Sequence, residues 1–568
     1  MPLCVGDFPP RFVDAASDLG DPAIVEGYYR ALESRPVRGA AALEEWLLDW
    51  AELDAWTDEE ESIRYVESTC QTDDPEREKR YLSFIEDVSP VIKSWSDRLN
   101  RKLLACSDIA SLPKSRYEVF LRRVKNAVDL FREENIQLQT EDEKLRQQYQ
   151  KVVGCMTVQH DGREQTLQEM NAYLERTDRA VRKDVWEKIA APWAQARAQI
   201  DEIYDQMIAL RHRIAVNAGR KDYREFAFAE MERFDYTPAD CERFADSIEQ
   251  IVVPVARKLG DARRKQLGLE TLRPWDMAVD PLGRAPLEPF SGAKALMDGC
   301  GRIFGKVSEV FGHEFGRMRA EGLLDLESRK GKAPGGYMMA YDGRRLPFIF
   351  MNAVGRQDDV QTLLHEGGHA FHAFAARDED LAFVREAPIE FAEVASMGME
   401  LLAGRFIDEF YADKAEAERA RIDHLDGVVR FFPYMACIDM LQHWVYTHPE
   451  HTREDRAAAW TALNRRFNDW VDHKEYEDSL AYLWHRKGHP FTVPFYYVEY
   501  GIAQLGALGV WLNSQRDFAG AVSSYRRALG LGGKRPLPEL FSTAGVKFDF
   551  SASAIQPLIS AASKTLSA

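Results

Sequence analysis

Residues Asp359–Ala376 read DVQTLLHEGGHAFHAFAA, a segment in which two histidines stand four residues apart. Its apolar residues recur every three or four positions, which predicts an amphipathic α-helix. Residues four apart project from the same face of a helix, so His365 and His369 can bind one zinc ion. Glu366 lies beside this face and is the expected general base, which takes a proton from a zinc-activated water. The segment thus predicts a catalytic site with one zinc ion per chain.

Gly367, Gly368 and His372, in the same segment, indicate how the predicted helix packs. Gly367 and Gly368 each cost about 1 kcal/mol relative to alanine inside a helix, so their presence beside a reactive centre indicates that another element approaches closely there. His372 lies one turn beyond His369. We expect His372 to pack against neighbours or to support the site rather than to bind the metal.

A catalytic zinc ion uses three protein ligands and keeps one position open for water, so a third ligand must come from elsewhere. The segment after Pro388, IEFAEVASMGME, predicts a second helix that carries carboxylates. Glu393 and Glu400 lie two turns apart on one face, so one can bind the metal while the other supports a histidine. Spacing alone leaves Glu390 and Glu386 as competitors.

Two apolar runs before the zinc segment flank Asp342-Gly343, a dipeptide typical of hairpin turns. We therefore predict strands at Tyr337–Tyr341 and Leu346–Met351. The hairpin ends only a few residues before the predicted zinc helix.

Helical periodicity dominates the rest of the chain, and the fold class is therefore expected to be mainly α. Long helices are predicted at Ala40–Ala55, Ala127–Val152 and Asp178–Ala215. The four prolines of Thr271–Phe290 predict an extended connection. We expect two interleaved parts, an N-terminal helical lobe over residues 1–190 and a catalytic region over residues 191–568.

The composition limits the possible partners and location. The 568 residues include 45 % hydrophobic residues, as in soluble globular proteins, and carry a formal charge of −18. That charge repels phosphate backbones and anionic lipids, which argues against nucleic-acid and membrane partners. The N-terminal MPLCVGDFPPRFVDAA lacks the features of a signal peptide, and the seven cysteines, Cys4 to Cys437, include no C-x-x-C pair. We therefore expect a cytoplasmic protein without disulfides.

Three segments together resemble the thimet oligopeptidase and oligoendopeptidase F group of zinc metallopeptidases: LPFIFMN from Leu346, GRQDDVQTLLHEGGHAFH from Gly355 and EVASMGME from Glu393. The last matches the group's Glu-x-x-Ser-x-x-x-Glu pattern, whose first glutamate is the third zinc ligand. The resemblance thus implies Glu393 as that ligand, with Ser396 and Glu400 completing the pattern. A weaker similarity covers GLGGKRPLPELFSTAGVKFDF near the C-terminus. The group's fold is a prolate, two-lobed helical body with a deep central channel and a small β-sheet beside the zinc helix.

The same group places a histidine and tyrosines across from the zinc ion, where they stabilise the oxyanion. The matching segment of this chain, HRKGHPFTVPFYYVEYG, contains His489, Tyr497 and Tyr500. The spacing between the histidine and the tyrosines differs slightly from that of the group, so Tyr496 competes with Tyr497.

The resemblance implies a zinc-dependent endopeptidase that hydrolyses internal bonds of short oligopeptides, with the hairpin offering an edge strand to the substrate backbone. Gly367 stands where the group more often has a larger residue, so the floor of the substrate site is expected to differ. One alternative is a helical zinc carboxypeptidase, a class that also has a His-Pro-Phe motif. His489-Pro490-Phe491 matches that motif, but those enzymes place it before the zinc helix. The other alternative is a non-catalytic peptide-binding protein.

Overall fold

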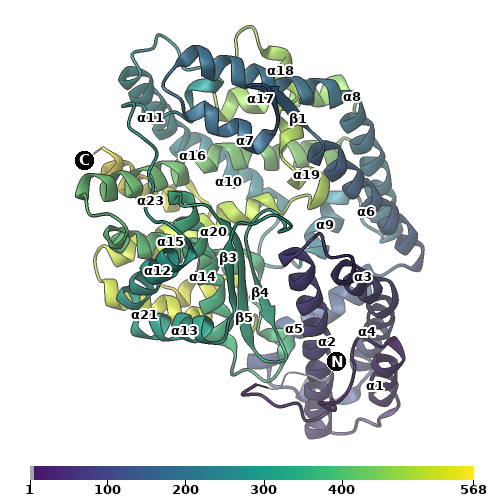
Figure 1. Cartoon of the computed structure of the whole chain (residues 1–568). Helices are drawn as coiled ribbons and strands as arrows, with labels where there is room; N and C mark the ends of the chain where they lie inside the picture. The colour runs from purple at the N-terminus through teal and green to yellow at the C-terminus, as the bar shows by residue number, and fades with distance from the viewer. Residues whose placement is uncertain (1–5, 568) are drawn as a thin grey trace. The chain divides into compact units, whose positions relative to one another are not determined.

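Helices make up most of the structure, a computed structural model that describes residues 6–567, and strands form only small sheets (Figure 1). The prediction of a mainly α fold is therefore confirmed. Among the described residues, no helix combines the length and the apolar composition needed to cross a bilayer. The described cysteines form no disulfide, and Cys4 lies outside the described residues.

The chain divides into two units that alternate along the sequence. The first unit comprises Met1–Asp129, Leu287–Arg421 and Ala503–Phe548, and the second comprises Leu130–Pro286, Ile422–Ile502 and Asp549–Ala568. Two helices, α16 (Lys414–Thr447) and α20 (Tyr497–Ser514), continue from one unit into the other. Residue 190, the end of the N-terminal lobe expected from the sequence, lies inside α8 (Arg179–Asn217).

The remaining helices are assigned to the units as follows. In the first unit they are α1 (Pro22–Ser34), α2 (Ala40–Cys70), α3 (Pro75–Ser83), α4 (Ser89–Leu104), α5 (Lys114–Leu130), α12 (Ala293–Val307), α13 (Glu309–Ala320), α14 (Gln357–Ala376), α15 (Ile389–Ala403), α21 (Phe518–Leu529) and α22 (Leu537–Thr543). In the second unit they are α6 (Glu133–Gly154), α7 (Leu167–Asn171), α9 (Tyr223–Glu230), α10 (Pro238–Ile251), α11 (Val253–Gln266), α17 (Arg453–Phe467), α18 (Glu477–Ala481), α19 (His489–Thr492) and α23 (Ala552–Leu566).

Local sequence explains where several of these helices begin. Threonines at positions 166, 237 and 452 form capping boxes with the acidic residue three positions later, which satisfies backbone N–H groups that a helix start leaves open. At the start of α14, Asp359 accepts hydrogen bonds from the N–H groups of Val354, Gly355 and Arg356. The start of the predicted zinc helix is thus held to the strand before it.

The predicted hairpin is present as β4 (Tyr337–Tyr341) and β5 (Leu346–Ala353), which pair antiparallel. A third strand, β3 (Leu324–Glu327), pairs parallel on the other side of β5, so β4 forms an edge of this sheet. The apolar residues of β5 are buried as far as Met351 because strands flank it and α14 packs on it (Figure 1).

The turn of this hairpin differs from the expected Asp-Gly turn. Arg345 adopts the left-handed conformation, with φ 58°, whereas Gly343 does not. Gly343 lies instead against the indole of Trp56, where a Cβ would overlap the ring. A glycine is therefore required at this position by a close approach rather than by its backbone angles.

Two features of the second unit were not predicted. The strands β1 (Thr157–His160) and β2 (Arg163–Thr166) form a hairpin around Asp161-Gly162, where both residues have positive φ. The helix predicted across Ala127–Val152 is interrupted near its start, because Arg132 is extended and α6 begins after it. Two glutamates in the first turn of α6 favour a helix start there through the helix dipole.

The N-terminal helices of the first unit surround an apolar core that includes Trp46, Trp50 and Trp95. Leu381 and Val384, from the connection between α14 and α15, belong to the same core. The segment that joins the two helices of the predicted zinc site is therefore buried by residues that precede it by more than 250 positions.

Candidate metal centre

His365 and His369 on α14 and Glu393 on α15 converge in the first unit. Oε2 of Glu393 lies 3.4 Å from Nε2 of His365 and 3.6 Å from Nε2 of His369, with side chains 6 %, 25 % and 15 % exposed in that order. One ligand atom from each residue lies within 4.8 Å of the others. Imidazole nitrogens and a carboxylate oxygen are common zinc ligands, and the partial exposure leaves space for a fourth ligand. The donor set fits a zinc ion, and of the competing carboxylates it contains Glu393.

A second layer of hydrogen bonds orients these ligand side chains. Nδ1 of His365 lies 2.6 Å from Oε1 of Glu400, and Ser396 Oγ donates to Glu393 Oε2 at 2.8 Å. Burial opposes the charged form of His365, yet its hydrogen bonds to Glu393 and Glu400 raise its pKa. For Glu393, burial raises the pKa but the hydrogen bond from His365 and the nearby histidines outweigh it, so its pKa is lowered. With the Nδ1 proton held by Glu400, Nε2 is left to face a metal.

Glu366 lies on α14 beside the first of these ligands and is 7 % exposed. Burial raises the pKa of its carboxyl group to about 7; the charge of His365 lowers it, and the charge of Glu393 raises it further. A backbone hydrogen bond from Met338 of β4 lowers it. The candidate base is therefore in contact with the edge strand of the sheet.

The two glycines of α14 allow close packing, as predicted. A Cβ on Gly368 would lie 2.6 Å from Cα of Ser396 on α15, and a Cβ on Gly367 would lie 2.5 Å from the ring of Phe304 on α12. Gly368 thus brings α15 close enough for Glu393 to reach the histidines. The space at Gly367 is filled by Phe304, so this residue affects helix packing in the core.

His372 does not take part in the donor group. Its ring packs 6.1 Å from that of Phe391, and the side chain is 7 % exposed. Burial, with a smaller effect from His369, lowers the pKa of His372 to about 3. This placement agrees with the packed role expected for it.

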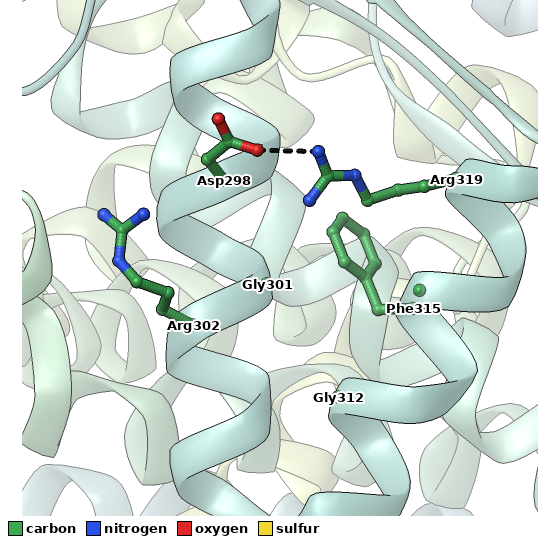
Figure 2. A pocket seen from close by; sticks show the side chains of 7 residues that line it. Asp298, Gly301, Arg302, Gly312, Phe315 and Arg319 are labelled. Atoms are coloured by element: carbon green, nitrogen blue, oxygen red, sulfur yellow. Dashed lines mark hydrogen bonds and ion pairs between the residues drawn. The ribbon is translucent and has the colours of Figure 1, made fainter.

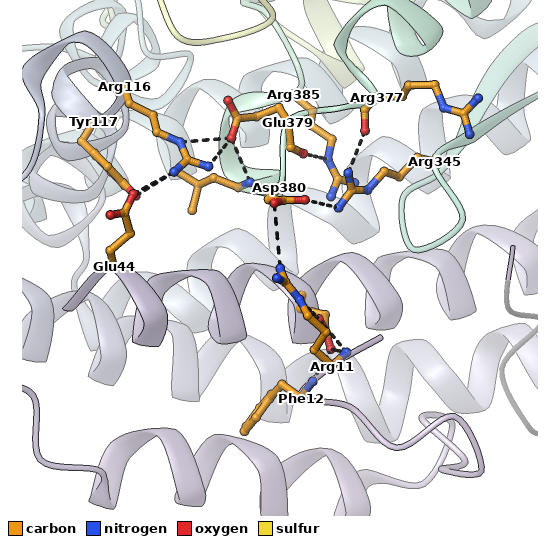
Figure 3. Close-up of polar contacts among 12 residues, drawn as sticks. Arg11, Phe12, Glu44, Arg116, Tyr117, Arg345, Arg377, Glu379, Asp380 and Arg385 are labelled. Atoms are coloured by element: carbon orange, nitrogen blue, oxygen red, sulfur yellow. Dashed lines mark hydrogen bonds and ion pairs between the residues drawn. The ribbon is translucent and has the colours of Figure 1, made fainter. Parts of the chain in front are cut away.

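The connection between α14 and α15, residues 377–388, is held by charged side chains from other parts of the first unit (Figure 3). Nε of Arg116 on α5 donates to Oε1 of Glu379 at 3.1 Å. Nη2 of Arg345, in the turn of the β4–β5 hairpin, donates to Oδ1 of Asp380 at 3.0 Å. These contacts have no local signature in the sequence, because their partners are far apart along the chain.

The C-terminal GLGGKR segment closes on the same connection. Gly532 has φ 51°, and a Cβ there would lie 2.6 Å from the carbonyl oxygen of Val384. The N–H of Gly533 donates to that carbonyl at 2.9 Å, and Nζ of Lys534 lies 3.3 Å from Oε2 of Glu379. The similarity noted for this segment in the sequence therefore corresponds to a structural brace for the two helices of the site.

The second unit brings together the four other residues singled out in the sequence. The ring of His489 lies 4.8 Å from that of Tyr497 and 6.0 Å from that of Tyr500, and the rings of Tyr496 and Tyr500 are 5.2 Å apart. Tyr497 and Tyr500 lie in the first turn of α20, after Pro494 as expected. The approach of this aromatic cluster to the metal ligands, which belong to the first unit, stays a prediction.

The two competing tyrosines differ in exposure. Tyr497 is 6 % exposed and packs under Lys487 and Phe431, whereas Tyr496 is partly exposed. Burial, with the charge of Lys487, lowers the pKa of His489 to about 4, so this histidine is neutral at pH 7. A neutral imidazole retains one N–H donor.

Cys241, Asp439 and His443 form another group whose possible ligand atoms lie within 4.8 Å of one another, all of them buried. Nη1 of Arg224 lies 3.4 Å from Nδ1 of His443, and Nε2 of His443 lies 3.3 Å from Oδ2 of Asp439. A guanidinium only donates, so Nδ1 accepts and Nε2 carries the proton, which makes no hydrogen bond to the described residues in this arrangement. A cation there would meet this proton and the charge of Arg224, so we interpret the group as a buried His–Asp pair.

Two cavities are lined by other residues than those of the predicted site. One, of about 290 Å³, lies between α12 and α13 (Figure 2). Its arginines are paired, Arg319 with Asp298 at 2.6 Å and Arg302 with Glu409 at 2.6 Å. The other, of about 470 Å³, lies in the second unit and has a mainly apolar lining. The first cavity thus offers no unpaired arginine for an anion.

Curated proteins resemble this chain in sequence over much of its length. Oligopeptidase PepF of Bacillus subtilis is 23 % identical over 403 residues, which covers 68 % of this chain and 57 % of the relative. An oligoendopeptidase F homolog of Borreliella burgdorferi is 25 % identical over 303 residues, 51 % of this chain and 49 % of the relative. The chain thus spans about half the length of these curated relatives.

Solved structures cover almost the whole chain. PZ peptidase A, solved with an inhibitor, is 26 % identical and superposes with a TM-score of 0.88, covering 99 % of this chain and 98 % of that one. Oligoendopeptidase F from Enterococcus faecium, at 17 % identity and a TM-score of 0.64, shares the fold over 96 % of each chain.

The family model of peptidase family M3 matches residues 172–558, and that of the peptidase M3 N-terminal domain matches residues 25–131. The first match includes the donor group on α14 and α15 and the aromatic cluster around His489. It extends over more than half of the chain and confirms the resemblance found in the sequence. The chain belongs to peptidase family M3.

Proposed function

We propose that the protein is a zinc-dependent endopeptidase that hydrolyses internal peptide bonds of short oligopeptides. The observation that carries the proposal is the convergence of His365, His369 and Glu393, with Glu366 beside them on α14. Membership of peptidase family M3 supports the peptidase reaction. The name of the Bacillus subtilis relative, an oligopeptidase, supports short peptides as substrates.

The three converging side chains would hold one zinc ion. When bound, zinc supplies a Lewis acid that acidifies water and polarises the substrate carbonyl. Glu400 holds the Nδ1 proton of His365, and Ser396 holds the Glu393 carboxylate, so both ligands are oriented before any metal arrives.

Glu366 would move the protons of the reaction. Its carboxylate takes a proton from the attacking water as the new C–O bond forms, and then gives that proton to the leaving amine as the C–N bond breaks. Its low exposure separates it from bulk solvent. The same residue thus acts first as base and then as acid.

The edge strand β4 would orient the substrate backbone. Its one partner among the described strands is β5, so its other side offers backbone N–H and C=O groups to an extended peptide. Met338 of β4 hydrogen-bonds Glu366 through its backbone. A peptide paired with β4 would therefore lie near the proposed base.

The aromatic cluster of the second unit would stabilise the oxyanion. His489, Tyr500 and one of Tyr496 and Tyr497 would donate hydrogen bonds to the developing negative charge. A donor that touches the substrate must be reachable, and Tyr496 is more exposed than Tyr497. Single substitutions to phenylalanine at these two positions separate them, because the oxyanion donor is the one whose loss lowers kcat.

The two alternatives make different products. A helical zinc carboxypeptidase releases single C-terminal residues, and a peptide-binding protein releases none. Placement of His489-Pro490-Phe491 after the zinc helix argues against the carboxypeptidase. The presence of a base beside the donor group argues against a binding protein.

Glu366→Gln tests the proposal. The amide retains the shape of the side chain but cannot accept the proton, so we expect turnover to fall on the order of 10³-fold or more while zinc content stays at one per chain. Glu314→Gln is the matched control, since it neutralises another glutamate of the first unit whose pKa burial raises to about 7. Turnover that survives in Glu366→Gln would remove Glu366 from its role.

A further inference from the structure

Phe495, the residue before Tyr496, has φ 66°. A bulky residue seldom adopts the left-handed region, and strained backbone persists only where its surroundings hold it. The Phe495 side chain is fully buried, with ring centroids of Phe228, His443 and Tyr446 at 5.8, 5.2 and 5.5 Å. These contacts hold the ring in place, so the backbone after Phe495 continues from a fixed position.

The N–H of Phe495 is held by a buried amide on α16. It donates to Oε1 of Gln442 at 2.7 Å. Nε2 of Gln442 donates in turn to the carbonyl of Ile438, one turn earlier on the same helix, at 3.2 Å. Gln442 is fully buried. Its acceptor oxygen is therefore fixed in direction and presented to Phe495.

The carbonyl of Phe495 is held from another direction by Arg233. Nη2 of Arg233 donates to this carbonyl at 2.5 Å and to Oε1 of Glu499 at 2.8 Å. Both side chains of this ion pair are buried. Because a guanidinium is a planar, rigid fork, it ties the strained residue to the first turn of α20, which carries Tyr500.

A third buried side chain supports the preceding helix. Nη1 of Arg211 donates to the carbonyl of Pro490 at 3.0 Å, and Nε of Arg211 donates to Oδ1 of Asp142 at 2.9 Å. Arg211 thus holds α19, which begins at His489. The backbone on both sides of the aromatic cluster is thus held by buried side chains: Arg211 from α8, Arg233 from the loop between α9 and α10, and Gln442 from α16.

We propose that Gln442 and Arg233 are positioning residues that clamp Phe495 in its left-handed conformation and so set the direction in which the tyrosines after it are presented. The inference rests on the proposed function, in which those tyrosines donate hydrogen bonds to the oxyanion. A glycine would adopt this conformation without strain. The chain instead has a phenylalanine whose ring is buried and whose backbone N–H and C=O are both hydrogen-bonded. This arrangement fixes the orientation of the residues that follow, in addition to stabilising the fold.

The first test compares Gln442→Met with Gln442→Glu. Methionine has a similar length but no acceptor for the Phe495 N–H, whereas glutamate keeps one. We expect kcat for a short peptide to fall on the order of 10–100-fold in Gln442→Met, with KM within about twofold, and most of the loss to be restored in Gln442→Glu. Gln165→Met is the control, because Gln165 is a buried glutamine of the same unit that bonds His160 in the β1–β2 hairpin.

A double-mutant cycle with the tyrosine distinguishes positioning from general stability. If Gln442 acts through Tyr500, the loss from Gln442→Met shrinks to little or nothing when Tyr500→Phe is already present. Losses that multiply in full, or a Gln442→Met enzyme with the kcat of the wild type, would overturn the inference. Zinc content serves as a second readout and should be equal in all variants, since the metal ligands lie in the other unit.

Failure of the proposed function gives a different pattern. If Tyr496→Phe, Tyr497→Phe and Tyr500→Phe all turn over like the wild type, the oxyanion role is wrong and the positioning role falls with it. Should Gln442→Met not fold, the double variant Arg233→Met/Glu499→Met removes the other clamp and leaves no unpaired buried charge. The same loss of kcat and the same cycle with Tyr500→Phe are expected from it, and unchanged kcat would contradict the inference.

Discussion

His365 is the proposed metal ligand whose second ring nitrogen is held by a carboxylate. Glu400 holds its Nδ1 at 2.6 Å, and its Nε2 faces Glu393. A histidine whose second nitrogen is fixed by a carboxylate presents a defined tautomer and a more basic ligand atom to the metal. Glu400 therefore orients a proposed metal ligand, although Glu400 itself lies outside the donor group.

Glu400→Gln should weaken zinc binding on the order of 10–100-fold, because the amide can still accept the Nδ1 proton but lacks the negative charge. Competition with a fluorescent chelator measures this affinity directly. Glu409→Gln is the control. Glu409 ends the short helical segment that follows α15, and it pairs with Arg302 and Lys306. Equal affinity in Glu400→Gln and the wild type would show that the hydrogen bond has no part in metal binding.

At this scale the sequence was informative about the histidines and less so about the third ligand. Spacing on a helix brings His365 and His369 to one face whatever surrounds them. The choice of Glu393 over Glu390 and Glu386 depends on how the 377–388 connection places α15 against α14. That placement is set by tertiary contacts, so spacing left it open and only the family pattern indicated it.

Among the elements, α14 and α15 form the pair that carries the donor group, and Gly368 determines how closely they pack. A methyl group at Gly368 would lie 2.6 Å from the Cα of Ser396, a backbone atom that cannot give way without moving α15. Glu393 lies one turn before Ser396 on that helix. Any shift of α15 therefore moves a proposed metal ligand.

Gly368→Ala should lower the free energy of unfolding by about 1–3 kcal/mol and should also weaken zinc binding. Urea denaturation and metal titration measure the two effects. Gly316→Ala on α13 is the matched control, because no atom lies within 4 Å of its added Cβ, and it should be neutral or stabilise by about 0.5–1 kcal/mol. If the two variants had the same free energy of unfolding and the same zinc affinity, close packing at Gly368 would not be what keeps the donor group together.

Elements were predictable where the signal was local. The periodicity of α14 and the apolar runs of β4 and β5 were recognised, since each lies within one segment. The β1–β2 hairpin was missed although Asp161-Gly162 marks its turn, because its strands have only four residues each. The brace formed by Arg116, Lys534 and Gly533 on the 377–388 connection joins residues hundreds of positions apart, and no local pattern reports it.

In the whole molecule, segments that follow one another along the chain alternate between the two units. Each unit is assembled from three separate stretches, and the proposed metal ligands and the proposed oxyanion donors belong to different units. The second unit also contains half-buried histidines whose pKa is lowered. Burial, with the charge of Arg273, lowers the pKa of His473 to about 4, against the opposing charge of Asp472.

Stability should therefore fall in acid through His473. Its pKa in the unfolded chain is near 6.5, so between that value and 4 the unfolded state binds a proton that the folded state does not. The contribution is fully present above pH 6.5 and is lost as the pH falls towards 4, by about 1–3 kcal/mol. Urea denaturation from pH 4.5 to 7.5 should show a shallower decline for His473→Gln, and parallel curves would contradict this.

The most direct test of the central claim is mass spectrometry of a pool of peptides of mixed length incubated with the purified protein. Zinc-dependent endopeptidase activity predicts internal cuts in short peptides by the wild type. These cuts should be abolished by a chelator, restored by zinc and absent with Glu366→Gln. Stepwise loss of single C-terminal residues would indicate a carboxypeptidase, and peptides bound but uncut by the zinc-loaded wild type would contradict a catalytic role altogether.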